Sequence, residues 1–140
     1  MHGRGARCAA SKEPGVLGLV LDWFIPVFKG MGFGLIAMIL HEAGHLVVAF
    51  LLGLHIYRFG VNWKGMYVVR EAGPLASNIM VSLAGPVTNL LLSFVWYRST
   101  SFSLVNLCFG LVNLLPIQSS DGDRILCSIE DHKRKRSAAD

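Results

Sequence analysis

The chain has 140 residues, of which 53% are hydrophobic and 16% charged, and its formal net charge is +4. Together with a mean hydropathy of +0.51, this composition excludes an ordinary water-soluble domain of the same length. The positive charge has no recognition motif or platform of aromatic and basic residues beside it, which excludes nucleic acid as a partner. We therefore expect one small domain embedded in a lipid bilayer.

Four apolar segments predict the fold class, an α-helical multi-pass membrane protein with about four transmembrane segments and a small β-hairpin at the membrane surface. The segments are residues 16–28, 31–54, 79–97 and 102–117. The first and last are short for a hydrocarbon core about 30 Å thick, which takes about 20 helical residues. The first is therefore also compatible with an interfacial or re-entrant piece. Because basic residues precede it and no small-residue cleavage site follows it, we interpret it as an uncleaved signal-anchor.

The second segment contains the pentad His41-Glu42-Ala43-Gly44-His45, an HExxH pattern. On a helix of about 3.6 residues per turn, His41 and His45 lie one turn apart on the same face and can bind one metal ion. Glu42 is then close enough to act on a metal-bound water. Two imidazoles and a carboxyl group in hydrocarbon would each cost about a few kcal/mol without partners, and a metal ion suits all three. The alternative is a helix whose histidines are satisfied core side chains facing other helices.

Hydrophobic and polar residues alternate between the second and third segments. Tyr57, Phe59, Val61 and Trp63 alternate with Arg58, Gly60, Asn62 and Lys64. This is the period-2 pattern of a strand with one apolar face, and Lys64 with Gly65 supplies a turn for a returning strand. We expect a β-hairpin at about 56–71 on the inner membrane surface. The alternative is an irregular loop that rests its aromatic side chains at the interface.

The third and fourth segments carry polar residues that suit a reaction centre. Asn89 and Asn113 are candidate donors to a substrate carbonyl or transition state, and the alternative for Asn89 is hydrogen bonding between helices. Pro116 is expected to break or kink the fourth helix, and Asp121 with Gly122 to form a tight turn. Because the second and fourth segments both run toward the cytoplasm, Asp121 arrives at the depth of the histidines. It completes the three protein ligands usual for catalytic zinc.

Positive charges predict the orientation. With four spans and a cytoplasmic N-terminus, 11 of the 13 Lys and Arg residues fall on the cytoplasmic side, leaving Lys29 and Arg98 outside. We therefore expect both termini to be cytoplasmic. The domain organisation is then a basic N-terminal tail at 1–14, a membrane-embedded core at 15–126 and a charged C-terminal tail at 127–140.

Three motifs in this order resemble the site-2 protease family of intramembrane zinc metalloproteases. They are HExxH in a membrane span, AGPxxN at residues 84–89 opening the next, and NLLPI followed by Asp-Gly at the end of a later span. The resemblance covers residues 31–126. It implies that His41, His45 and Asp121 bind one zinc ion (Zn²⁺) per chain and that Glu42 is the catalytic base. The hairpin is similar in position to the family's membrane-associated β-element, which holds substrate as an added strand.

The chain departs from the family pattern at two positions. NxxPxPxxDG is met at Asn113, Pro116, Asp121 and Gly122. Gln118 stands where the second proline is usual, and Asp123 replaces the commoner second glycine. These departures leave the ligands intact and concern the shape of the loop and the fit of a substrate.

The resemblance implies a zinc metalloendopeptidase that hydrolyses peptide bonds in or near transmembrane segments, as in regulated intramembrane proteolysis. Its partners are then transmembrane protein substrates and the lipid bilayer; the natural substrate and the oligomeric state stay open. One alternative is a catalytically silent scaffold of the same fold that binds transmembrane helices, against which the retained Glu42 argues. A metal transporter is the other, but a permeation route would need several intramembrane clusters where the sequence has one.

Overall fold

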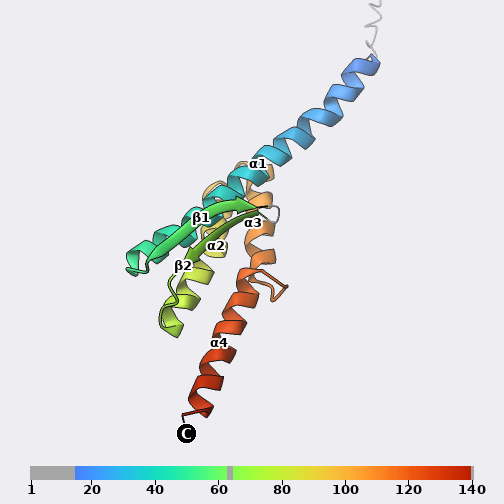
Figure 1. The fold of residues 1–140 in the computed structure, drawn as a ribbon. Helices are drawn as coiled ribbons and strands as arrows, with labels where there is room; N and C mark the ends of the chain where they lie inside the picture. The colour runs from blue at the N-terminus through green and yellow to red at the C-terminus, as the bar shows by residue number, and fades with distance from the viewer. Residues whose placement is uncertain (1–14, 63–64, 140) are drawn as a thin grey trace, which may run out of the picture.

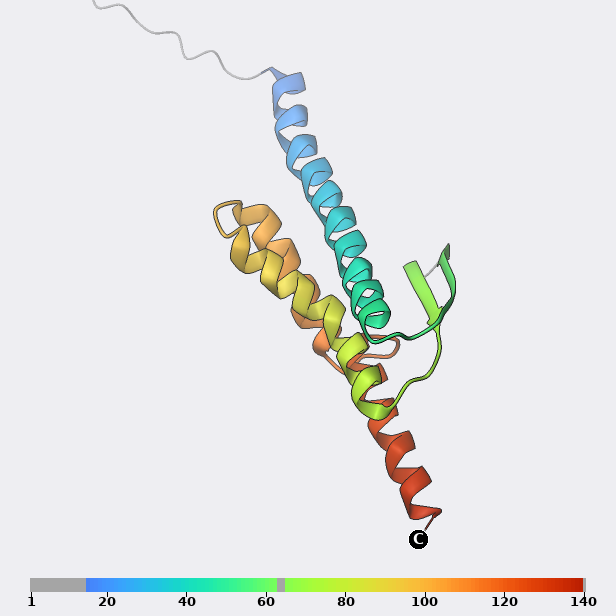
Figure 2. The same cartoon turned by 90° about the vertical axis from the view of Figure 1, so that its left-hand side faces the viewer.

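A computed structural model describes residues 15–62 and 65–139. In chain order its elements are α1 (Val16–Leu51), β1 (Ile56–Asn62), β2 (Gly65–Arg70), α2 (Leu75–Val95), α3 (Thr100–Leu114) and α4 (Asp121–Ser137). Helices α1, α2 and α3 pack together, and the hairpin lies beside the end of α1 from which it continues (Figures 1 and 2). The N-terminal half of α1 and most of α4 project from this bundle in opposite directions.

Helix α1 runs unbroken through 36 residues, and the expectation of separate segments at 16–28 and 31–54 was wrong. Nothing between them ends a helix, since the glycines that follow Lys29 each weaken a helix by only about 1 kcal/mol. At about 1.5 Å per residue the helix is about 54 Å long, well beyond a hydrocarbon core of about 30 Å. One continuous helix crosses a bilayer only once. In the structure the first two segments therefore form one helix, and the number of membrane crossings stays a prediction.

The later helices lie close to their expected positions. Residues Val20–Leu51 of α1 and all of α2 are long and apolar enough to cross a membrane, whereas α3 is apolar but shorter. Helix α3 ends at Leu114, two residues before Pro116, because a residue that precedes proline is disfavoured in helical conformation. The expected break at Pro116 is confirmed.

The predicted β-hairpin is present, and the irregular-loop alternative is wrong. Strands β1 and β2 pair antiparallel, from Ile56 opposite Arg70 to Asn62 opposite Gly65, with an irregularity between Ile56 and Arg58. The expected turn falls on residues 63–64, outside the described residues. Within residues 15–62 and 65–139 the sheet has two strands, so one edge of β2 has no β partner among them.

The interior of the bundle is polar and small, whereas its surface is apolar. Among the described residues the buried hydrophobic side chains are Ala37, Ala49, Val81 and Ala84. The buried polar ones are His41, His45, Ser82, Asn89, Ser93, Asn106 and Asp121. Large hydrophobic residues such as Phe50 and Phe94 are 78% and 80% exposed. This distribution is typical of helices packed in lipid, where small and polar residues make the contacts between helices.

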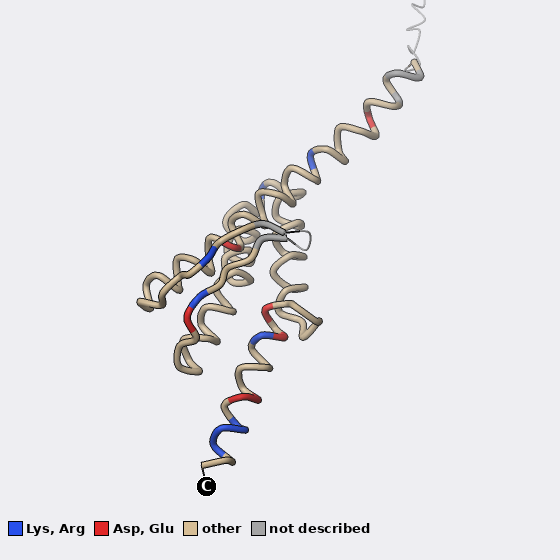
Figure 3. Tube along the Cα trace, viewed as in Figure 1, with Lys and Arg blue, Asp and Glu red and all other residues tan. Residues whose placement is uncertain are grey.

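Charged residues are few in the helix bundle. They gather on the hairpin and α4 and are sparse along α1 (Figure 3). Apart from Glu42, the described part of α1 carries only Asp22 and Lys29. The hairpin and α4 therefore carry most of the charge, and they flank the end of the bundle at which the HExxH pentad lies.

Candidate metal centre

Helices α1 and α2 approach closely beside the HExxH pentad because glycines lie on both sides of the contact. A Cβ atom on Gly44 of α1 would lie 2.9 Å from the carbonyl oxygen of Ala84 and would clash with the Thr88 hydroxyl. A Cβ atom on Gly85 of α2 would lie 2.7 Å from Nε2 of His41 and would clash with the ring of His45. Small residues let helix backbones come together, so Gly85 leaves the space that the imidazoles fill.

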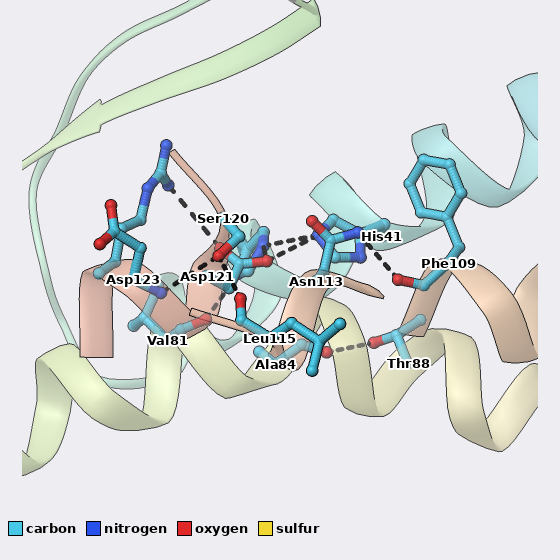
Figure 4. A network of polar contacts seen from close by, with 12 residues as sticks. His41, Val81, Ala84, Thr88, Phe109, Asn113, Leu115, Ser120, Asp121 and Asp123 are labelled. Atoms are coloured by element: carbon cyan, nitrogen blue, oxygen red, sulfur yellow. Dashed lines mark hydrogen bonds and ion pairs between the residues drawn. The ribbon is translucent and has the colours of Figure 1, made fainter. Parts of the chain in front are cut away.

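Three buried side chains bring their ligand atoms together at this contact (Figure 4). Nε2 of His41 lies 2.9 Å and Nε2 of His45 3.3 Å from Oδ2 of Asp121. The two Nε2 atoms are 3.2 Å apart, and all the ligand atoms lie within 4.8 Å of one another. Ligands bound at about 2.0–2.1 Å around a tetrahedral zinc ion lie about 3.3 Å from each other. The spacing of these three atoms therefore fits a zinc ion held by three protein ligands.

The ring of His45 is oriented by α2. Its Nδ1–H donates a 2.6 Å hydrogen bond to the carbonyl oxygen of Val81, which leaves Nε2 as the nitrogen directed at the cluster. The ring of His41 packs edge-on against Phe109, with 5.9 Å between ring centroids. Its Nδ1 is buried without a partner within 15–62 and 65–139. The outer hydrogen bond that orients a metal-binding imidazole is thus present for one histidine.

Asp121 is positioned by the loop between α3 and α4. Ser120 caps α4: its Oγ accepts a 3.2 Å hydrogen bond from the Asp123 backbone N–H and donates a 2.6 Å bond to the carbonyl oxygen of Leu115. Asp123 in turn accepts a 3.1 Å bond from the backbone N–H of Ser119, which has a φ of 75°. Asp123, at which the chain departs from the family pattern, therefore helps to hold the loop that positions Asp121.

The expected tight turn at Asp121 and Gly122 was wrong, since these are the first two residues of α4. Gly122 is a position of close approach, where a Cβ atom would lie 2.7 Å from the carbonyl oxygen of Leu115 and would clash with that of Leu114. The Ser-x-x-Asp pattern at 120–123 is a helix N-terminus signal and identifies the cap from sequence. Gln118, the other departure, is exposed in the loop.

The carboxyl group of Asp121 is ionised at neutral pH. Burial disfavours its charged form, but hydrogen bonds from His41 and His45 outweigh that effect and lower its pKa to about 2. Arg124, one turn further along α4, lies 3.9 Å from Oδ1 of the same carboxylate. A deprotonated carboxylate is the form that binds a metal ion.

Glu42 and His45 line a cavity of about 530 Å³ beside the cluster. The cavity is bordered by residues 68–72 of β2 and the segment after it, by the N-terminal part of α2 and by the first turns of α4. Glu42 is half-buried, with no ion pair to another described residue. Its carboxylate is therefore adjacent to the ligands and open to whatever enters the cavity.

The two candidate asparagines do not line this cavity. Asn89 is fully buried, and neither atom of its amide has a partner among the residues described. Asn113 donates a 2.9 Å hydrogen bond to the carbonyl oxygen of Phe109 in its own helix. Their expected contact with a transition state stays a prediction, and in the structure both occupy helix-packing positions.

Several residues of the site carried no prediction from sequence. Gly85 was expected only to favour helix packing. The sequence alone does not say which side chains fill the space beside a glycine. The carbonyl of Val81 has no side-chain signature at all. Arg70 and Arg124, which border the cavity, were counted only as charges that orient the chain.

Two curated proteins are similar to this chain in sequence. The stage IV sporulation protein FB of Bacillus subtilis is 31% identical over 66% of this chain and 37% of its own length. The zinc metalloprotease MJ0392 of Methanocaldococcus jannaschii is 28% identical over 70% of this chain and 33% of its own length. The chain thus spans about a third of the length of these relatives. No protein-family model matches it.

Among solved structures, the fold matches the site-2 protease from Methanocaldococcus jannaschii with a TM-score of 0.64. The match has 23% sequence identity and covers 83% of this chain and 66% of the other. The fold and the buried cluster together define a helical membrane protein with a candidate metal centre. The chain is thus similar in sequence to a zinc metalloprotease and to a sporulation protein, and it has the fold of a solved site-2 protease.

Proposed function

We propose that the protein is a zinc-dependent endopeptidase that hydrolyses peptide bonds in or near transmembrane segments of membrane proteins. The observation that carries the proposal is the convergence of His41, His45 and Asp121 next to a cavity that Glu42 and His45 line. Three ligands with a free fourth position are typical of catalytic zinc, whereas a structural site is usually closed by a fourth protein ligand.

The residues of the site have separate roles. His41, His45 and Asp121 would hold the zinc ion, which when bound supplies a Lewis acid that makes water a nucleophile near neutral pH. Glu42 accepts a proton from the attacking water and passes it to the leaving amine. The hydrogen bond from His45 to the Val81 carbonyl keeps the imidazole in the orientation that the cluster needs.

Strand β2 is the element that we propose to bind the substrate. A peptide bond in a helix is hydrogen-bonded and sterically covered, so the substrate must unwind before it is cleaved. One side of β2 pairs with β1, and its C-terminal end, together with the two residues that follow it, borders the cavity. An extended substrate that adds to the free edge of β2 replaces its lost backbone hydrogen bonds and passes beside Glu42.

The proposal is tested with Glu42→Gln in the full chain in lipid vesicles, with a single-pass membrane protein as substrate. We expect cleavage to fall by at least about a hundredfold, because general base catalysis is worth about 10²–10⁴ in rate, while bound zinc stays at one ion per chain. Glu130→Gln, an exposed change on α4, is the matched control and should cleave at the wild-type rate. Equal turnover by wild type and Glu42→Gln would rule out the protease mechanism.

The same experiment decides between the protease and the catalytically silent scaffold. A scaffold binds the transmembrane segment of the test protein but releases it uncut in both wild type and Glu42→Gln. Bound zinc does not distinguish them, since either protein can carry the ion. Glu42 favours the enzyme, because a structural zinc site has no need of an adjacent carboxylate that faces a cavity.

A further inference from the structure

Two arginines face the cavity from opposite sides, and the proposed mechanism uses neither. Arg70 is the last residue of β2, and Arg124 lies in the first turn of α4. Both border the cavity that Glu42 and His45 also line. They come from elements far apart in sequence, so their convergence is a property of the fold.

Arg70 is held in place by neutral groups. Its Nη1 donates a 2.9 Å hydrogen bond to Oδ1 of Asn78 and a 3.1 Å bond to the carbonyl oxygen of Glu71. Asn78 is itself bonded to the backbone N–H and carbonyl of Gly73, which fixes it relative to the strand. Within the described parts of the chain no carboxylate lies within 4.0 Å of the Arg70 guanidinium. Its position is fixed while its charge is left without a counterion.

The charge of Arg124 is also poorly compensated. Its Nη1 is 3.9 Å from Oδ1 of Asp121, too far for a hydrogen bond, and that carboxylate is already bonded to the histidines. Burial, and then repulsion from Arg124, lower the pKa of Arg70, so the two guanidinium groups act on each other across the cavity. Both remain charged at physiological pH.

Two carboxylates at the rim do not neutralise this pair. Glu71 and Asp131 border the cavity, but both are exposed and neither forms an ion pair with a described arginine. In water, exposed side chains of this kind contribute little to the field inside a cavity. Arg70, fixed by Asn78, and the exposed Arg124 therefore place two positive charges at the cavity that Glu42 also lines, and the fixed guanidinium of Arg70 offers an anion-binding position next to the reaction centre.

We propose that Arg70 and Arg124 bind a carboxylate of the substrate and thereby select peptides that carry an acidic group close to the scissile bond. The inference rests on the proposed protease function and names the substrates it prefers. Planar guanidinium groups bind carboxylates through paired, charge-assisted hydrogen bonds. Arg124 reaches the carboxylate of Asp121, and an extended peptide advances about 3.3 Å per residue. The acidic group therefore lies within about three residues of the cleaved bond.

The test uses synthetic single-pass peptides in phosphatidylcholine vesicles that differ in one residue, Glu or Gln, placed in turn at each of the three positions on either side of the cleaved bond. We expect wild type to cleave the Glu peptide at least about tenfold faster at one position, a difference that a single charge-assisted contact supplies. Arg70→Gln and Arg124→Gln should each remove the preference while still cleaving the Gln peptide. Arg134→Gln, which removes a charge from the exposed end of α4, should retain it.

A charge reversal provides the sharper variant. Arg124→Glu should prefer a Lys peptide over a Glu peptide at the same position, which no general loss of folding produces. A wild-type enzyme that cleaves Glu and Gln peptides equally at all positions would overturn the inference while leaving the protease function intact.

Binding is measured separately, so that failure of the protease function can be recognised. Glu42→Gln is incubated with fluorescent Glu and Gln peptides in the same vesicles, and dissociation constants are compared. At least about tenfold tighter binding of the Glu peptide, lost in Glu42→Gln combined with Arg124→Gln, supports the carboxylate site even if no peptide is cut. Equal binding of the two peptides contradicts it.

Discussion

At the scale of single residues, the site depends as much on absent side chains as on the ligands. His41 and His45 have space for their rings because Gly85 on the neighbouring helix has no Cβ. Asp121 reaches them because Gly122 lets the start of α4 lie against the carbonyl groups that end α3. These glycines act through space, not through backbone flexibility, since both lie inside helices.

Gly85→Ala is predicted to abolish zinc binding and proteolysis. The added methyl group would occupy the space of the His45 ring and lie 2.7 Å from Nε2 of His41, so the imidazoles must move away from Asp121. Zinc content of the purified protein measures the effect, and we expect affinity to fall by at least about tenfold.

The matched control is Gly34→Ala, at a helical glycine of α1 whose Cβ would meet nothing within 4 Å. It should keep zinc and activity, and it removes an unfavourable helical glycine worth about 1 kcal/mol. Full zinc occupancy in Gly85→Ala would contradict the close packing of α1 against α2 at this position.

Most of the proposed ligand set could be predicted from sequence, because its chemistry resides in side chains at regular spacing. His41 and His45 share a helix face at any helix position, and Asp121 follows from the order of the segments. The positions of Asn89 and Asn113 could not be predicted, since both side-chain amides suit a substrate contact as well as helix packing. Only the rotation of each helix decides between these roles, and that rotation depends on partners distant in sequence.

At the scale of elements, the unbroken α1 changes the expected path of the chain. If α1, α2 and α3 each cross the bilayer once, the two termini lie on opposite sides of it. The 13 Lys and Arg residues then divide eight to five in favour of the side that holds the hairpin and α4, so the positive-inside rule still makes that side cytoplasmic. The cytoplasmic N-terminus expected from four spans depends on a break that the structure lacks.

We predict that a tag at the N-terminus is accessible only from outside the cell and a tag at the C-terminus only from the cytoplasm. Protease protection of tagged protein in sealed vesicles of known orientation measures this directly. Protection of both tags on the same side would mean that α1 breaks in the membrane or that α3 does not cross.

Deleting the hairpin tests its proposed role as a substrate partner. Replacing residues 56–70 by a flexible linker of the same length should abolish cleavage of a helical substrate, because no free strand edge remains to pair with the unwound segment. Zinc content should stay at the wild-type value, since all three proposed ligands lie outside the hairpin. Cleavage at the wild-type rate would show that β2 is not needed to bind the substrate.

The hairpin was predictable and the continuity of α1 was not, for different physical reasons. Alternation at Tyr57 and Phe59 reports directly on a strand with one apolar face. By contrast, Lys29 and the glycines after it look like a boundary in hydropathy, although neither residue type prevents helical backbone conformation. A change of composition locates the end of an apolar segment, not the end of a helix.

At the scale of the whole molecule, the proposed ligands join elements that the chain separates by 80 residues, from His41 on α1 to Asp121 on α4. A ligand that binds only the folded state stabilises it by an amount that grows with its concentration. Zinc should therefore act as a link that holds α4 and its loop to the bundle.

We predict that removing zinc with a chelator lowers the Tm of the protein in detergent, and that adding zinc restores it. At a free zinc concentration about 100 times its dissociation constant, the stabilisation is about 2.7 kcal/mol. Glu42→Gln should show the same shift as wild type because it keeps all three ligands, and Asp121→Ala should show a much smaller one. A Tm that does not respond to zinc in wild type would contradict a metal centre built by these residues.

The length of α1 couples the molecule to the thickness of its membrane. Its first turns expose Trp23, Phe24 and Ile25, side chains that water disfavours, so the helix tilts to keep them in lipid instead of projecting upright into solvent. Tilt grows as the bilayer thins, and the HExxH pentad, which lies beyond Pro26 near the other end of the same helix, is expected to change depth with it. The length of the lipid acyl chains then partly sets the depth of the HExxH pentad in the bilayer. The surrounding lipid thereby influences which peptide bond of a substrate is cleaved.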